Sequence, residues 1–226
     1  WRRDFYERFY PIVKNAKSAY EAAVILNNNI FELVGVIYST KRPKADQSPY
    51  ESIEAGLASC TGLSFMLIDA CRSVGIPARF VGTPSWYNNS GNHSWVEIWD
   101  NGWHFTGAFE PTENRLNEGW FTGLASRSVK GHPKYGIYAA TWKKTDIYFP
   151  MDWKPGVDKY FAVDVTSRYQ DFLDSNFIHI KETVPLFEEI DFLIESGLNI
   201  CESGLKLSKG LNKHEVLMVP KKIVTK

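Results

Sequence analysis

Ala58-Ser59-Cys60-Thr61-Gly62-Leu63-Ser64 is the stretch that decides the fold, because it opens an amphipathic helix with a cysteine in its first turn. Apolar residues recur after it at helical spacing and form one continuous stripe: Leu63, Met66, Leu67, Ala70, Cys71 and Val74. Ser59 is a typical N-cap residue, and Gly75 and Pro77 are typical stop signals. The pattern therefore predicts a helix that begins at Cys60.

The first turn of a helix favours a thiolate, because its backbone N–H groups are free and the helix dipole is positive there. A helix N-terminus or a neighbouring imidazolium lowers a cysteine pKa to roughly 3.5–7.5. The same N–H groups can stabilise an oxyanion when the sulfur attacks a carbonyl. We interpret Cys60 as a nucleophile. Cys71 lies on the apolar stripe, where we expect a small buried side chain.

A β-hairpin follows, because His93 to Trp99 and Trp103 to Glu110 flank the turn signal Asp100-Asn101-Gly102. If Asn101-Gly102 is a two-residue loop, counting outward pairs Ile98 with Phe105 and His93 with Glu110. This register predicts one mostly apolar face: Ser94, Val96, Ile98, Trp103, Phe105 and Phe109. A Glu110 carboxylate opposite His93 could hold the imidazole ring, whereas a slip of one residue would place Phe109 there.

Composition excludes several classes of function. The 226 residues fit one ordinary globular domain with a small appendage, and 26 Lys+Arg balance 26 Asp+Glu, so nothing indicates nucleic acid or an anionic membrane. Cys60, Cys71 and Cys201 show no metal-ligand spacing, so we expect no metal and no cofactor. No apolar run is long enough for a membrane span. The chain begins without Met inside a helical pattern, so we expect a trimmed upstream segment and lean towards an extracytoplasmic location.

The rest of the chain is less informative. Residues 1 to about 35 have helical spacing interrupted near Pro11, and Asn27-Asn28-Asn29 is expected to end or bend a helix. Ile76 to Gly82, Ile137 to Trp142 and Tyr160 to Thr166 are predicted strands. We place one domain at residues 1–170, with its core motifs at 45–121, and a C-terminal extension of short strands at 171–226.

Four motifs together resemble the transglutaminase-like superfamily. They are Gln47-Ser48-Pro49, Ala58 to Ser64, Gly75-Ile76-Pro77-Ala78-Arg79, and Asn92 to Trp99 followed by Gly102-Trp103. The resemblance implies an α+β, papain-like core in which the nucleophile helix packs on an antiparallel sheet. It also implies a Cys-His-acid triad, carried here by Cys60 and His93.

The third member of the triad departs from the family pattern. The family usually places Asp followed by Pro at the position that is Gly107 here, and Glu110-Pro111 comes three residues later. The hairpin count independently favours Glu110, and Asp100 is the alternative, although we expect that turn residue to be solvated. Gln47 is a further candidate, as an oxyanion donor.

Two classes of function remain open. The first is cysteine-dependent acyl transfer or hydrolysis on the amide bonds of a protein, peptide or peptidoglycan-type substrate, through a thioester. The second is an inactive or weakly active module of the same fold that binds peptide or glycan through surface aromatic residues. That surface would comprise Trp86, Tyr87, Trp95 and Trp120.

Overall fold

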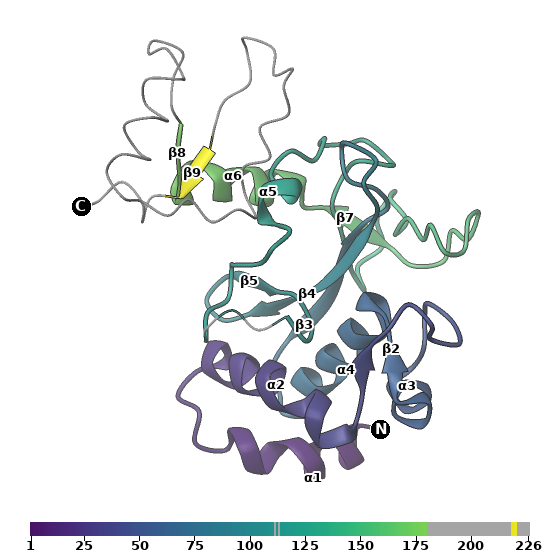
Figure 1. Cartoon of the computed structure of the whole chain (residues 1–226), viewed down its shortest axis with the longest axis vertical. Coiled ribbons are helices and arrows are strands. Elements are labelled where there is room, and N and C mark those ends of the chain that lie inside the picture. Colours follow the sequence, from purple (N-terminus) through teal and green to yellow (C-terminus); the bar gives the residue numbers. More distant parts are fainter. Residues whose placement is uncertain (111, 113, 180–217, 221–226) are drawn as a thin grey trace, which may run out of the picture. The chain divides into compact units, whose positions relative to one another are not determined.

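The computed structural model describes residues 1–110, 112, 114–179 and 218–220, and it divides the chain into two compact units, Trp1–Gln170 and Asp171–Lys226. The first unit combines helices with an antiparallel sheet (Figure 1), which confirms the predicted α+β class. Its helices are α1 (Arg2–Val13), α2 (Ala19–Val34), α3 (Pro49–Ala55), α4 (Cys60–Ser73), α5 (Thr122–Ala125) and the start of α6 (Thr166–Asn176). None of the described helices is long and apolar enough to cross a membrane.

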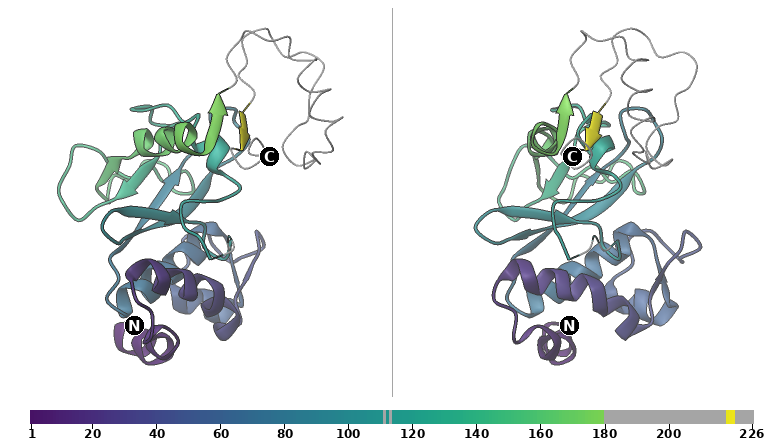
Figure 2. Two further views of the ribbon diagram at one scale, coloured as in Figure 1. Left: turned by 90° about the vertical axis from the view of Figure 1, so that its left-hand side faces the viewer. Right: turned by 60° about the vertical axis from the view of Figure 1, so that its left-hand side comes forward.

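The strands of the first unit form two sheets. A five-stranded antiparallel sheet has the order β5 (Trp103–Thr106), β4 (His93–Trp99), β3 (Ala78–Thr83), β6 (Tyr138–Ala140) and β7 (Ala162–Asp164). A short parallel pair joins β1 (Ile37–Tyr38) to β2 (Leu57–Ala58). The helices α1 to α4 lie together on one side of the large sheet (Figure 2).

Helix α4 is the central element of this layer, since it contacts α1, α2, α3 and the strands β3 and β4. The predicted stripe is buried from Leu63 to Cys71, and the helix begins at Cys60 with Ser59 as its N-cap residue. Ser59 makes no side-chain cap bond, because its hydroxyl accepts a hydrogen bond from Arg42 Nε at 3.0 Å instead. The helix ends at Ser73, and Gly75 follows with a positive φ of 90°.

Shortening Leu67 to alanine should destabilise the protein by about 2–5 kcal/mol, because Leu67 is fully buried and the change leaves a cavity under the sheet. Cys60→Ala should leave the stability nearly unchanged, since Cys60 is only partly buried at the end of the helix. Denaturant unfolding of the two variants measures both effects. Equal losses would mean that Cys60 is a structural residue.

The hairpin of β4 and β5 exists, but the predicted register is wrong by one residue. Trp99 pairs with Trp103 and Val96 with Thr106, so the loop has three residues, Asp100 to Gly102, rather than two. Asn101 adopts a positive φ of 55°, and the Asp100 carboxylate accepts a hydrogen bond from the backbone N–H of Tyr20 at 2.9 Å. That bond ties the loop to the start of α2, so Asp100 is not a solvated turn residue.

The shift of one residue in the pairing moves each side chain of β5 to the face of the sheet opposite to the predicted one, because side chains alternate along a strand. Val96 and Ile98 face α4 as predicted, but Phe105 lies on the opposite face. There its ring packs 5.1 Å from that of Tyr169 in α6, and Tyr169 donates a hydrogen bond to Glu97 at 2.9 Å.

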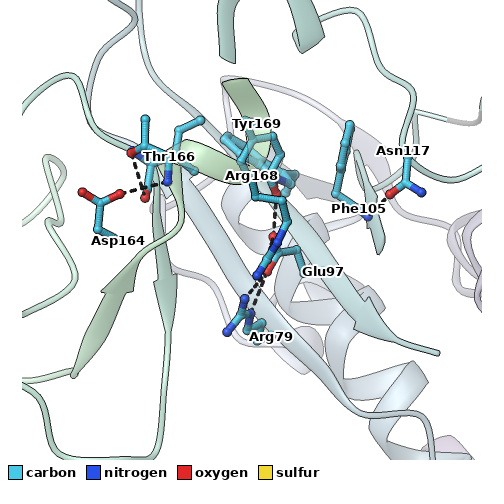
Figure 3. Close-up of polar contacts among 10 residues, drawn as sticks. Arg79, Glu97, Phe105, Asn117, Asp164, Thr166, Arg168 and Tyr169 are labelled. Carbon is cyan, nitrogen blue, oxygen red and sulfur yellow. Dashed lines mark hydrogen bonds and ion pairs between the residues drawn. The ribbon is translucent and has the colours of Figure 1, made fainter. Parts of the chain in front are cut away.

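Glu97 is the buried charge on this second face, and its side chain is almost fully enclosed. Its carboxylate pairs with Arg79 at 2.6 Å and with Arg168 at 2.7 Å, and it also accepts the Tyr169 hydroxyl (Figure 3). The indole N–H of Trp95 donates in turn to the Tyr169 oxygen at 2.7 Å. These bonds connect the start of α6 to the two central strands.

The N-terminal residues form two helices with a break near Pro11, but the prediction for Asn27-Asn28-Asn29 is wrong. Pro11 lies inside α1, and the break between α1 and α2 comes after Val13. Asn27-Asn28-Asn29 neither ends nor bends a helix, because α2 continues to Val34. The reason is tertiary: Asn27 is buried and its amide is fully bonded to residues of another segment.

The second unit is described at only a few positions. Strand β8 (Phe177–His179) pairs with β9 (Met218–Pro220) in an antiparallel ladder. Residues 171–176 of the predicted extension continue α6 rather than form a strand. Residues 180–217 and 221–226, including Cys201, lie outside the described residues, as do Pro111 and Glu113.

Candidate active site

Cys60 occupies the first position of α4, and its thiol is partly buried. Burial is the largest influence on its pKa and raises it. A hydrogen bond with His93 and the charge of that ring act in the other direction, and so do bonds with the Ser94 backbone and the Thr61 side chain. The balance holds the pKa of the Cys60 thiol below its ordinary value. The arrangement therefore favours a thiolate.

His93 is the first residue of β4 and is only 5% exposed. Aromatic rings enclose it: Phe121 lies 4.8 Å away, Trp120 4.9 Å and Trp95 5.7 Å between ring centroids. Burial, the largest influence, lowers the pKa of the imidazole, but the contacts with Cys60 and Glu110 outweigh it and raise that pKa to about 9. A thiol with a lowered pKa beside an imidazole with a raised pKa is the setting of a thiolate–imidazolium pair.

Glu110 reaches His93 although the predicted register is wrong. Its Oε2 lies 3.5 Å from His93 Nε2, a separation that gives an ion pair rather than a short hydrogen bond. The same oxygen accepts a hydrogen bond from the indole N–H of Trp120 at 2.9 Å. Since β5 ends at Thr106, the loop after the strand brings the carboxylate to the ring.

Two other predicted polar residues do not reach the reacting groups. Gln47 is buried beside the first turn of α4, but its Nε2 donates to the backbone oxygens of Glu51 at 3.3 Å and Leu57 at 3.1 Å. Both amide hydrogens are thus used, so the expected oxyanion donor is not available. Asp100, the alternative acid, is held by the N-terminus of α2.

The four aromatic residues expected to form a binding surface are divided by the fold. Trp86 is 2% exposed and Trp95 is fully buried, and their rings stack 6.2 Å apart. These two belong to the core behind His93, so the expectation of a four-residue surface is wrong. Trp120 is 62% exposed at the site, and the Tyr87 hydroxyl accepts a hydrogen bond from Arg127 at 2.9 Å.

Asn27 contacts the loop that carries Glu110, although it belongs to none of the motifs that predict the site. Its amide lies against the loop that carries Glu110, and Nδ2 donates to the backbone oxygen of Gly107 at 2.9 Å. A signal was present in the sequence, because Asn27 falls at i+4 from Ala23 and i−4 from Phe31, on the buried stripe of α2. An amide on a buried helical stripe indicates a specific tertiary partner.

Residues 8–108 match the family model described as the transglutaminase-like superfamily. This part of the chain is transglutaminase-like. The matched region begins well before the motifs at 45–121, since it includes α2 and the second half of α1, and it contains Cys60 and His93. It ends two residues before Glu110, so the match does not extend to the third acid.

A crystal structure of a candidate cysteine protease from Cytophaga hutchinsonii is similar to this chain, with 20% sequence identity and a TM-score of 0.40. The similarity covers 51% of this chain and 39% of that one. No curated protein matches. The match of the transglutaminase-like core supports a cysteine-dependent enzymatic role in general terms.

Proposed function

We propose that the protein catalyses acyl transfer or hydrolysis on amide bonds, with Cys60 as nucleophile and His93 as general base and acid. The observation that carries this proposal is the pairing of opposite pKa shifts: the pKa of the Cys60 thiol is lowered and that of the His93 imidazole is raised to about 9. The contact between the two side chains contributes to both shifts against the effect of burial, and Glu110 adds to the shift of His93.

The mechanism follows from these positions. The Cys60 sulfur, having lost its proton to His93, attacks the amide carbonyl and forms a C–S bond. The oxyanion is stabilised by the free N–H groups of the first turn of α4. His93 then gives its proton to the leaving amine as the C–N bond breaks, and a thioester remains on Cys60. Water or a second amine, deprotonated by His93, releases the acyl group.

Glu110 is proposed as the third member of the triad. Its carboxylate faces Nε2 of His93, so Nδ1 is the ring nitrogen left for Cys60. The negative charge stabilises the imidazolium, which is the role of the acid in such triads. Trp120 covers the pair and holds the carboxylate through its indole N–H.

A protein, peptide or peptidoglycan-type amide is the proposed substrate class. An aromatic hollow of about 800 Å³ lies between α4 and the loop after β6, and it shares Phe149 and Trp153 with a small pocket beside His93. Test peptides should therefore carry bulky apolar side chains near the scissile amide. The alternative function, a binding module without catalysis, has less support because Trp86 and Trp95 are buried.

A comparison of wild type with Cys60→Ala tests the proposal. Each is incubated with a peptide library and with a labelled primary amine, and products are identified by mass spectrometry. We expect cleaved or amine-labelled peptides with wild type and none above background with Cys60→Ala. Binding of peptides by both proteins without any Cys60-dependent product would reject the enzyme and favour the binding module.

A further inference from the structure

The segment from Gly107 to Glu110 is a tight turn that directs the carboxylate of Glu110 back over the backbone. The Glu110 N–H donates to the Gly107 oxygen at 3.3 Å, which closes a β-turn of four residues. Phe109 adopts a positive φ of 63°, a conformation that side-chain-bearing residues rarely adopt. A turn of this kind persists only when its surroundings hold it.

Gly107 provides the space into which Glu110 folds. A Cβ atom on residue 107 would lie 2.0 Å from Oε2 and 2.7 Å from Cδ of Glu110. The Glu110 carboxylate therefore occupies the place where a side chain at 107 would begin. A side chain at position 107, such as an acid, would collide with the Glu110 carboxylate in its observed position. Glycine at 107 is therefore required for the acid three residues later to occupy this place.

Asn27 is the group that holds the turn. Its Nδ2 donates to the Gly107 oxygen at 2.9 Å and to the Thr106 hydroxyl at 3.0 Å, and its Oδ1 accepts the Phe109 N–H at 2.9 Å. The side chain is only 3% exposed. All donors and one acceptor of this amide are thus directed at the end of β5 and at the turn. The ring of Phe31, one helical turn further along α2, packs 5.0 Å from that of Phe109.

We propose that Asn27 is a positioning residue for the triad: it fixes the Gly107–Glu110 turn and thereby holds the Glu110 carboxylate against His93. This inference rests on the proposed function, because it assigns a role to Asn27 through Glu110. The hydrogen bonds of the Asn27 side chain go to Thr106, Gly107 and Phe109, and none of these bonds goes to Cys60 or His93. The effect of Asn27 must therefore disappear when Glu110 no longer carries a charge.

The test uses alkylation of Cys60 by iodoacetamide between pH 5 and 10, which needs no substrate. Asn27→Ala should lower the rate at pH 6 by about tenfold or more and shift the profile to higher pH, because the imidazolium loses its carboxylate. Asn28→Ala is the matched control, since Asn28 lies next to it on α2 and bonds the exposed Asn114 at 2.9 Å. That control should keep the wild-type profile.

A double-mutant cycle with Glu110→Gln separates positioning from a general structural role. In the Glu110→Gln background, Asn27→Ala should change the rate by less than about twofold. The same loss in both backgrounds, or a lowered melting temperature with an unchanged pH profile, would overturn the proposal. An unchanged profile for Glu110→Gln alone would also overturn it, because Glu110 would then have no role to be positioned for.

Gly107→Ala is a second variant that disturbs the same turn, and it replaces Asn27→Ala in the test if Asn27→Ala does not fold. Its Cβ should displace the Glu110 carboxylate and reproduce the Glu110→Gln profile, and a wild-type profile would contradict the inference. If wild-type Cys60 is no more reactive than an ordinary thiol, the proposed function fails. If wild-type Cys60 is reactive but insensitive to Asn27→Ala and Gly107→Ala, only the positioning inference fails.

Discussion

Replacing His93 with asparagine should abolish the labelling of Cys60 by brief iodoacetamide treatment at pH 6. In the wild type, the contact with His93 lowers the thiol pKa, and the imidazole, with a pKa of about 9, is protonated at pH 6. Without the ring, the hydrogen bond and charge of His93 no longer oppose burial, so the pKa of Cys60 should rise. The thiolate fraction falls about tenfold for each unit by which pH lies below the pKa, so we expect a loss of about 100-fold or more.

The pH dependence of the Cys60 alkylation rate shows in which direction the thiol pKa changes. Wild-type alkylation should begin well below pH 8, whereas the His93→Asn profile should rise only above it. Cys71 is an internal control, because burial raises its pKa to about 12 and it should stay unlabelled in both proteins until they unfold. His132→Asn is a matched variant, since the His132 ring accepts backbone hydrogen bonds from Lys134 and Tyr135 and stacks on the Tyr135 ring, in a loop. Equal labelling of Cys60 in wild type and His93→Asn at pH 6 would remove His93 from the site.

Glu110→Gln should reduce acylation of Cys60 by peptide substrate by roughly 10²–10⁴-fold, the range found for groups that act on a catalytic proton. The variant keeps the size of the side chain and an oxygen for the Trp120 indole. It removes the charge that stabilises the imidazolium, and its amide can donate to Nε2, which would put the ring proton on the nitrogen facing Cys60. In that tautomer His93 cannot accept the thiol proton. The partial exposure of Glu110 and its 3.5 Å separation from His93 favour the lower part of the range.

Single-turnover acylation and the pH profile of alkylation measure the effect. Glu118→Gln is a suitable control, because Glu118 is partly exposed and pairs with Arg115 at 3.1 Å. Glu97 would be a poor control, although it lies on the same strand as His93. Its carboxylate is buried between Arg79 and Arg168, so Glu97→Gln is expected to destabilise the fold. A Glu110→Gln profile that matches wild type would leave Cys60 and His93 as a dyad.

Glu110 lies beside His93 although the hairpin register from which the sequence predicts this proximity is wrong. The sequence predicts a two-residue loop at Asn101-Gly102, and the structure has three residues there because Asp100 binds the N-terminus of α2. The slip removes Glu110 from the ladder, since β5 ends at Thr106. The turn held by Asn27 then returns the carboxylate to His93. That turn depends on bonds between residues about 80 positions apart, which no local pattern encodes.

The prediction that Trp86 and Trp95 lie at the surface is wrong for a related reason. Trp86 precedes a polar run of Asn and Ser, which is typical of an exposed loop. Its ring is nevertheless buried next to Trp95 and Phe121, at centroid distances of 6.2 and 6.4 Å. Local polarity reports on the neighbours in sequence, whereas burial is decided by what packs against the ring in space.

The sequence by itself determined α4, its cysteine and the strand that carries His93, because helix caps, a 3.6-residue period and strand alternation are all written in consecutive residues. Only the tertiary structure decided the hairpin register, the continuation of α2 through Asn27 and the identity of the groups around His93. A one-residue change in loop length exchanges strand faces at almost no local cost. A buried amide is satisfied only by the segment that folds against it. Both are settled by contacts between distant parts of the chain.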